Sequence, residues 1–165
     1  MNGDFSQGWT YWYNNIAGGA QLGIGTCGAP SSPYYVWFGD AAEQTGVDNM
    51  SYDIYQDIFI PYSNVSDVTL TYKTSINTLD GTTYDYDHFS LDLEDQAGNY
   101  LTDLGYFSNM NADNGIPGCQ TWNGWGQPIS SQYWGSNLRL HLKSYTDPSN
   151  PTIFRIDDVA INVKL

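Results

Sequence analysis

Basic residues are scarce in this sequence. Lys and Arg together number 5, against 18 Asp and Glu among 165 residues, so the formal net charge is −13. Nucleic-acid binding depends on clustered Lys and Arg that neutralise phosphates, so this balance argues against DNA or RNA as a partner. It fits a soluble secreted protein or one that carries divalent ions. No segment reaches the roughly 18 consecutive apolar residues of a membrane span, so we expect no membrane insertion.

Glutamate, histidine and catalytic motifs are rare as well. Only 2 of the 18 acidic residues are Glu, and the other 16 are Asp, which favours turns and ion-binding loops. The two histidines lie outside any zinc-type spacing, and no Gly-x-Ser-x-Gly nucleophile motif occurs. A glycosidase needs only two carboxylates across a cleft, but Asp-rich turns account for these acids without catalysis. We therefore predict that the protein is not an enzyme, with a small acidic hydrolase as an alternative.

The sequence contains only two cysteines. Cys27 and Cys119 each lie in a stretch rich in Gly and Pro. An even number of cysteines in the loops of an extracellular domain predicts a disulfide. Such a bond would stabilise the fold by about 4 kcal/mol in the chain-entropy model. Two free thiols are the alternative. We accordingly expect a secreted protein, extracellular or at the cell surface.

The length of the chain fits one domain with its own core. No internal repeat or linker divides it, so residues 1–165 are expected to form a single β-sandwich domain. Met1 stands directly before Asn2 and Gly3, as at an expression start on a domain excised from a larger secreted protein. A targeting segment would then have been removed. Other domains of that parent protein are expected partners.

What is abundant favours β-structure. The sequence holds 14 Tyr, 6 Trp, 6 Phe and 17 Gly, and apolar residues alternate with polar ones in many short segments. The clearest alternation runs over residues 68–76. Further strands are predicted at residues 34–39, 51–60, 89–93, 100–104 and 138–142, with Phe5 and Trp9 as anchors of a first strand. Eight or nine short strands between Gly, Pro and Asn turns, without an amphipathic helix, predict an all-β, two-sheet antiparallel β-sandwich of the jelly-roll type.

The last predicted strand, residues 152–163, changes phase in its middle. Phe154 and Ile156 share one parity and the apolar residues after them take the other, which predicts a β-bulge at Asp157 and Asp158. Two adjacent carboxylates inside an apolar strand need hydrogen-bond donors or a cation if they are buried. Ca²⁺ suits them because it collects carboxylate and backbone oxygens. The alternative is that both aspartates face solvent at a strand edge.

Residues 109–132 are predicted to form a loop too long for a plain connection, and therefore a functional one. This segment contains Trp122, Asn123, Trp125 and Gln127. Sugars stack their apolar CH faces on aromatic rings and hydrogen-bond through their hydroxyls to amides and carboxylates. The combination therefore predicts a carbohydrate-binding site on this loop. The alternative is that the two tryptophans cap the end of the core.

A second segment mixes aromatic and polar residues in the same way. Tyr84 and Tyr86 alternate with Asp85 and Asp87, and the two tyrosines join the predicted carbohydrate-binding residues. His88 follows directly and is explained by a solvated acidic loop. The other histidine, at position 141, lies on the outward parity of its strand and is explained as a surface residue.

The two ends of the chain resemble a known family. The opening Asn2-Gly3-Asp4-Phe5-Ser6 and the closing Phe154-Arg155-Ile156-Asp157-Asp158-Val159 are similar to the termini of calcium-containing jelly-roll carbohydrate-binding modules of secreted xylanases and glucanases. In that family the two ends meet on adjacent strands. The resemblance implies that Asp4, Asp157 and Asp158 hold a structural Ca²⁺. Many relatives carry Glu where this chain has Ser6, so Asp4 and backbone carbonyls must contribute more.

The middle of the chain resembles the MAM-like jelly rolls of secreted bacterial proteases and surface proteins, through residues 56–61, 86–91 and 151–154. The leading hypothesis is a non-catalytic extracellular carbohydrate-binding module with a structural calcium ion, which binds a polysaccharide by aromatic stacking and polar hydrogen bonds. The alternative is a MAM-like protein-interaction or adhesion module of a secreted protease or cell-surface protein. Asp85 and Asp87 are candidates for a further calcium ligand or for a ligand site of their own.

Overall fold

The computed structural model of the chain describes residues 2–14, 21–24 (backbone only), 28, 30–31, 33–39, 48–112 and 121–165. These residues contain ten strands: β1 (Tyr13–Asn14), β2 (Gln21–Ile24), β3 (Tyr34–Phe38), β4 (Met50–Phe59), β5 (Asp67–Thr78), β6 (His88–Asp95), β7 (Tyr100–Ser108), β8 (Asn123–Pro128), β9 (Asn137–Thr146) and β10 (Thr152–Lys164). Two short 3-10 helices, η1 (Asn109–Asn111) and η2 (Ser131–Tyr133), lie between them. In the described part of the chain, no helix is long and apolar enough to cross a membrane.

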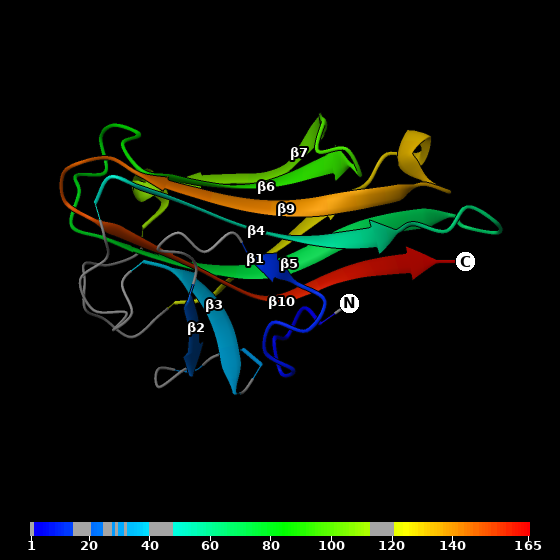
Figure 1. Cartoon of the computed structure of the whole chain (residues 1–165), viewed down its shortest axis with the longest axis horizontal. Coiled ribbons are helices and arrows are strands. Elements are labelled where there is room, and N and C mark those ends of the chain that lie inside the picture. The colour runs from blue at the N-terminus through cyan, green and yellow to red at the C-terminus, as the bar shows by residue number, and fades with distance from the viewer. Residues whose placement is uncertain are drawn as a thin grey trace.

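The strands form two five-stranded antiparallel sheets (Figure 1). Sheet A has the order β1-β4-β9-β6-β7, and sheet B has the order β2-β3-β10-β5-β8. Figure 1 shows the long strands of sheet A above those of sheet B, with the β5–β6 and β9–β10 loops at the left-hand end. The prediction of an all-β, two-sheet sandwich is confirmed.

The core fills the space between the two sheets, because alternate side chains of each strand point inward. In β9 the inward row is Leu138, Leu140 and Leu142, and in β5 it includes Leu70 and Tyr72. Leu140 and Leu142 are fully buried, and each such side chain contributes about 1.5–3 kcal/mol to folding. The outward residues of the same strands are polar, so the alternation read from the sequence fixes which face of each strand enters the core.

Strand β10 contains the predicted bulge. Its pairing register with β5 shifts between Asp157 and Ala160, and Asp158 adopts a φ of 54°. Phe154 before the bulge and Val159 after it both face the core. The bulge therefore inserts a residue that returns the apolar side chains to the interior after the phase change, as the sequence predicted.

The predicted first strand is largely wrong. Residues 2–12 form turns, and the first strand is the two-residue β1 that follows them. Phe5 is fully buried, but it has a φ of 50°, and the Gly8 amide donates to its carbonyl oxygen at 2.9 Å. The buried indole of Trp12 donates to the Asn2 carbonyl oxygen at 2.8 Å. The aromatic residues of this segment are thus spaced for tight turns that still reach the core.

The predicted long loop at residues 109–132 is also only partly correct. The segment Asn123–Pro128 is strand β8, which pairs with β5 at the edge of sheet B, with Trp125 opposite Tyr72. Gly124 and Gly126 weaken the strand signal in the sequence, because glycine has low β-propensity. Residues 113–120 lie outside the described part of the chain. Because Cys27 and Cys119 both lie outside the described residues, their disulfide stays a prediction.

The outer faces of the two sheets differ. On sheet B a second apolar cluster of Tyr35, Trp37 and Ile153, with Trp122 packed against it, covers part of the face. On sheet A the outward side chains of β4, β6 and β9 are aromatic, charged or hydroxylated, and several are partly exposed. Within the described structure, sheet A therefore has an outer face on which aromatic and polar side chains lie together.

Candidate functional site

The two ends of the chain meet, as the resemblance implied. The Val159 amide donates to the Gly3 carbonyl oxygen at 2.9 Å, next to the bulge of β10. A Cβ atom at position 3 would overlap the Val159 carbonyl group, so this close approach requires glycine. A cavity of about 490 Å³ adjoins the contact and is lined by Asp4, Ser6 and Asp158 among others.

Asp157 is fully buried at this junction. Its Oδ2 accepts a hydrogen bond from the Ser31 amide at 2.9 Å, and its Oδ1 accepts one from the Asp158 amide at 2.8 Å. Burial raises the pKa of Asp157 to about 7, and the neighbouring Asp158 and Asp4 carboxylates act in the same direction. The alternative that both aspartates face solvent is therefore wrong for Asp157.

The other two predicted calcium ligands have partners of their own. Asp158 forms an ion pair with Lys73 at 2.8 Å and accepts a hydrogen bond from the Ser31 hydroxyl. Although burial would raise the pKa of Asp158, these donors lower it. Asp4 is exposed and accepts hydrogen bonds from the Ser6 amide and hydroxyl at 3.2 and 2.9 Å. Asp4, Asp157 and Asp158 are thus neighbours at the junction of the chain ends, with Lys73 already neutralising one of them.

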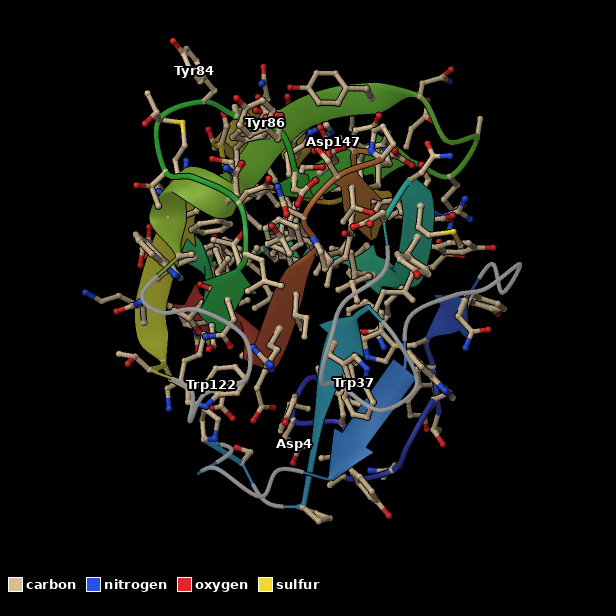
Figure 2. All side chains as sticks on the ribbon, turned by 90° about the vertical axis from the view of Figure 1, so that its left-hand side faces the viewer. Asp4, Trp37, Tyr84, Tyr86, Trp122 and Asp147 are labelled. Carbon is tan, nitrogen blue, oxygen red and sulfur yellow. The ribbon has the colours of Figure 1, made fainter. Side chains whose placement is uncertain are left out.

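The predicted carbohydrate-binding tyrosines lie on the β5–β6 loop, at the left-hand end of Figure 1. Tyr84 is 65% exposed and Tyr86 is 40% exposed, and their rings meet edge to face at 6.0 Å. Both line a cavity of about 400 Å³ with Asp80 and Ser149. Figure 2, which looks onto this end, shows Tyr84 and Tyr86 in the same upper region as Asp147, and Trp122 well below them.

The other four predicted residues lie on or beside β8. Trp125 is 42% exposed, and its indole N–H donates to the Thr74 hydroxyl at 2.8 Å. Trp125 and Gln127 line a cavity of about 310 Å³ between β7 and β8. Asn123 is half-buried at the start of β8.

Trp122 is also half-buried, and its ring meets Tyr35 at 5.4 Å in the apolar cluster on sheet B. The capping role that the sequence left open therefore describes Trp122 better than Trp125. The structure does not bring the six predicted residues together. It divides them among the β5–β6 loop, the cavity at Trp125 and the apolar cluster on sheet B.

The outer face of sheet A carries a group of aromatic rings that the sequence reasoning missed. The imidazole of His88 lies between two tyrosine rings, 5.8 Å from Tyr106 and 5.1 Å from Tyr145, with near-parallel planes. His88 is directly opposite Tyr145 in the β6–β9 ladder, and it is half-buried there. The prediction of a solvated acidic loop at His88 is therefore wrong. Outward parity was the available signal, but strand order and register were needed to place the three rings together.

A charged network lies on the same face beside these rings. His141 contacts Glu94 through Nδ1 at 3.0 Å and Asp53 through Nε2 at 3.1 Å. The Lys143 ammonium donates to Asp92 at 3.0 Å and to Glu94 at 2.6 Å. Burial would raise the pKa of Glu94, but the hydrogen bonds from Lys143 and His141 outweigh it and lower that pKa. His141 points away from the core as predicted, but it is held in an ion-pair network.

Part of the ring stack and part of the network line one cavity of about 480 Å³ on the outer face of sheet A. Its lining includes the rings of His88, His141 and Tyr145, the Asp53 carboxylate and the Lys143 ammonium. Ser51 and Ser90 add hydroxyls. We call this cavity the sheet A pocket. It combines apolar ring surface with donors and acceptors, which is the chemistry that a sugar requires, and its volume lies in the usual range of small-ligand sites.

Further aromatic surface extends along β4. The ring of Tyr55 stacks on the ring of Tyr13 of β1, with 5.0 Å between the centroids. The guanidinium of Arg139 lies over the Tyr55 ring, 3.8 Å from its centroid. Arg139 also forms an ion pair with Asp57 at 2.9 Å. The outer face of sheet A therefore carries aromatic rings on both sides of the charged network.

Searches against known proteins relate this chain to solved structures alone. No protein-family model and no curated protein matches its sequence. Among solved structures it is similar to the carbohydrate-binding module TmCBM61, in a complex with β-1,4-galactotriose, with a TM-score of 0.63 and 12% identity over 99% of this chain and 97% of that chain.

The chain is also similar to two cleaved adhesin domains of Lys-gingipain from Porphyromonas gingivalis W83. For the K1 domain the TM-score is 0.61, with 16% identity over 94% of this chain and 92% of that chain. For the K3 domain the TM-score is 0.60, with 18% identity over 98% of this chain and 97% of that chain. At these identities the likeness establishes a shared β-sandwich fold.

Proposed function

We propose that the protein is a non-catalytic carbohydrate-binding module and that a glycan chain binds in the sheet A pocket. The observation that carries this proposal is the stack of Tyr106, His88 and Tyr145 beside a network of paired charges on an open sheet face. The similar structures support it, because the same sandwich fold occurs in a carbohydrate-binding module that was solved with β-1,4-galactotriose and in an adhesin domain.

The chemistry of the pocket fits a sugar ring. The Tyr145 ring, which is 37% exposed, and the half-buried His88 ring offer apolar contact for the CH groups of a pyranose. Asp53 and Lys143 offer an acceptor and donors at fixed positions, because each is already held by a partner across the sheet. A preorganised polar site loses little conformational entropy when the ligand binds, which favours affinity.

The proposed ligand is a neutral glycan. With a formal net charge of −13, the protein repels polyanions over several ångströms at low salt. The basic residues of the sheet A pocket do not offset this repulsion, because Lys143 and His141 each contact two carboxylates. Uronic-acid polymers and sulfated glycans are therefore disfavoured.

The charges of the pocket also support binding without catalysis. A glycosidase needs a carboxylic acid with a raised pKa and a second carboxylate across the scissile bond. Beside the sheet A pocket the network lowers the pKa of Glu94, so this acid is not kept protonated. Burial and the adjacent Asp87 raise the pKa of Asp80 to about 7, but Asp80 lies at the end of the sandwich and does not line the pocket.

A structural calcium ion at the chain ends is part of the proposal. Asp157 is buried beside Asp158 and Asp4, and of the three carboxylates only Asp158 has an ion-pair partner within the described structure. Asp4 and Asp157 would hold the ion, with the Lys73 ammonium competing for Asp158. The ion would clamp the opening turn to β10. If chelator leaves the melting temperature unchanged and elemental analysis finds no bound ion, this part is wrong.

The extracellular location and the role of the six sequence-predicted residues are likewise proposals. A secreted module fits the acidic, Asp-rich composition and the predicted bond between Cys27 and Cys119. Trp125 with Gln127, and Tyr84 with Tyr86, line two further cavities and are candidates for additional glycan contacts. Each of them is separable from the sheet A pocket by mutation.

Affinity electrophoresis with single variants tests the proposal. The panel contains neutral galactans, xylans, mannans and glucans, with pectate and a sulfated glycan for comparison. Tyr145→Ala should weaken binding of the retained glycan by at least about 10-fold, which corresponds to about 1.4 kcal/mol. Tyr62→Ala removes a ring that is 69% exposed on the β4–β5 loop and should bind normally.

The outcomes of this experiment separate the surfaces and the functions. Loss of binding in Trp125→Ala with normal binding in Tyr145→Ala would move the site to the cavity between β7 and β8. Failure of every glycan to retard the protein would contradict the proposed function and favour a protein-interaction or adhesion module. Release of reducing sugar would show an enzyme.

A further inference from the structure

Three aspartates converge at the end of the sandwich that Figure 2 faces. Asp80 follows β5 of sheet B, Asp87 directly precedes β6, and Asp147 directly follows β9 of sheet A. One carboxylate oxygen of each lies within 4.8 Å of the others. Within the described part of the chain this is the one group of three acidic, His or Cys side chains that is gathered so closely. We call it the end cluster.

The fold holds these carboxylates together through main-chain contacts. The Asp147 amide donates to Asp87 Oδ1 at 2.7 Å, because β6 and β9 are paired and place the two residues side by side. The Asp80 amide donates to the Thr78 hydroxyl at 2.9 Å, and that hydroxyl is 2.7 Å from the hydroxyl of Thr152. Carboxylates from both sheets are thus fixed at one point by the strand ends themselves.

The end cluster has donors for some of its carboxylate oxygens, from the Asp147 amide, Thr152 and Asn150, but not for all of the buried ones. Asp87 is fully buried, and its Oδ2 has no hydrogen-bond partner; the same is true of the buried Oδ2 of Asp80. Asp147 accepts hydrogen bonds from the Ser149 amide at 2.8 Å and hydroxyl at 3.1 and 3.4 Å. Among the described ion pairs, none joins Lys, Arg or His to these three aspartates. A buried carboxylate oxygen without a donor or a counter-charge is strongly unfavourable, so something must neutralise it.

We propose that Asp80, Asp87 and Asp147 bind one divalent cation and that this ion is Ca²⁺. Calcium takes oxygen ligands at about 2.3–2.6 Å, so two oxygens on one ion lie up to about 5 Å apart, which the cluster satisfies. Three carboxylates suit Ca²⁺ better than Mg²⁺, which usually keeps several waters and only one or two carboxylates. The ion joins a residue that follows sheet B to two residues of sheet A, so it closes this end of the sandwich.

The ion also fixes the loop that carries Tyr84 and Tyr86. Asn109, which is fully buried, donates to the carbonyl oxygens of Gly81 and Tyr84 at 2.7 and 2.9 Å, and its Oδ1 accepts from the Tyr86 amide at 2.9 Å. Asn109 therefore holds the middle of the loop. The two ends of the loop are Asp80 and Asp87, and the cation ties these ends together. This site is independent of both the sheet A pocket and the proposed ion at the chain ends.

The competing explanation of the end cluster is a proton shared between Asp80 and Asp87, without a metal. The two explanations differ in whether the protein binds Ca²⁺ at the end cluster and in how an Asp→Asn substitution changes that binding. Asn replacing Asp keeps the shape and supplies an amide donor, so a proton-sharing pair tolerates it, whereas a cation site loses a charged ligand.

The test is a titration of Ca²⁺ alone into chelator-treated full-length protein, by calorimetry and by melting temperature. Wild type should bind Ca²⁺ and melt at a higher temperature with it. Asp87→Asn should lose the binding event of the end cluster. Asp157→Asn, at the other proposed ion, should keep the binding event of the end cluster. Asp67→Asn, an exposed carboxylate elsewhere, should match wild type.

Two results would overturn the proposal. One is that wild type binds no Ca²⁺. The other is that Asp87→Asn and Asp147→Asn both bind Ca²⁺ as wild type does, including the case in which Asp157→Asn alone abolishes the binding. If Asp87→Asn does not fold, Asp147→Asn decides, since Asp147 is only half-buried and the substitution leaves its amide in place. Glycan binding in the sheet A pocket is measured separately, so failure of the one is distinguishable from failure of the other.

Discussion

Replacing Glu94 by Gln removes the acid that joins Lys143 and His141 on the outer face of sheet A. The side chain is 5% exposed and accepts from Lys143 at 2.6 Å, while His141 contacts it at 3.0 Å. Breaking an isolated buried ion pair costs about 3–5 kcal/mol. In Glu94→Gln, Lys143 keeps its ion pair with Asp92 and His141 keeps its contact with Asp53. We therefore expect a smaller loss of about 1–3 kcal/mol in the free energy of unfolding at pH 7.

The pH dependence gives this prediction its sharpest form. Burial alone would raise the pKa of Glu94, but the hydrogen bonds from Lys143 and His141 hold it below its usual value. The stabilisation is therefore fully present above the unfolded-state pKa of about 4.3, and it is lost as the pH falls through the lower folded-state pKa. The difference in stability between wild type and Glu94→Gln should be largest near neutral pH and should shrink in strong acid.

Urea denaturation of both proteins at several pH values between 3 and 7 measures this difference. Asp57→Asn is the matched control, because it breaks the exposed pair with Arg139, which we expect to contribute less than about 1 kcal/mol. A Glu94→Gln difference that stays constant over the whole pH range, or that does not exceed the control at pH 7, would refute the role of Glu94 as the charged centre of the network.

Three further predictions concern the fold and the loops. Gly3→Ala should lower the melting temperature strongly in thermal denaturation, because the new Cβ would overlap the Val159 carbonyl group; a normal melting temperature would show that the chain ends do not meet this closely. Leu140→Ala should lower the free energy of unfolding by about 2–5 kcal/mol in urea, and a loss below about 1 kcal/mol would contradict its fully buried position. Asn109→Ala should speed proteolysis within residues 79–87, since it removes four hydrogen bonds to that loop; an unchanged cleavage rate would mean that other contacts hold it.

Much of the fold is predictable from local patterns. The alternation at residues 68–76 and at Leu138, Leu140 and Leu142 depends only on the period of a strand, and β5 and β9 follow it. The phase change at Asp157 and Asp158 predicted the bulge of β10, because the apolar residues on both sides must face one core. Such features are decided by the neighbours in sequence.

Elements that depend on distant partners were not predictable. The glycines of β8 give it a loop-like sequence, and it is a strand because β5 supplies its hydrogen bonds. Phe5 and Trp12 reach the core from turns, whereas spacing alone suggested a strand. In both places the tertiary environment overrides the local preference.

The residues of the candidate site also divide into those that local sequence points to and those that depend on distant strands. Tyr84, Tyr86 and Trp125 were proposed as sugar-binding residues because polar residues flank them, and all three are at least partly exposed. The stack of Tyr106, His88 and Tyr145 was not foreseen, because it needs three strands in one particular order and register. Of the end cluster only Asp87 was named as a candidate ligand, since the three aspartates follow or precede three different strands.

The most direct measurement of the central claim uses the two histidines of the chain, because both of them line the sheet A pocket. Imidazole NMR signals of the unmodified protein can be followed while a neutral oligosaccharide is added. If the glycan binds in the sheet A pocket, the signals of both His88 and His141 shift and saturate together with the ligand. If the glycan binds while both imidazole spectra stay unchanged, or if no neutral glycan binds at all, the proposed site is wrong.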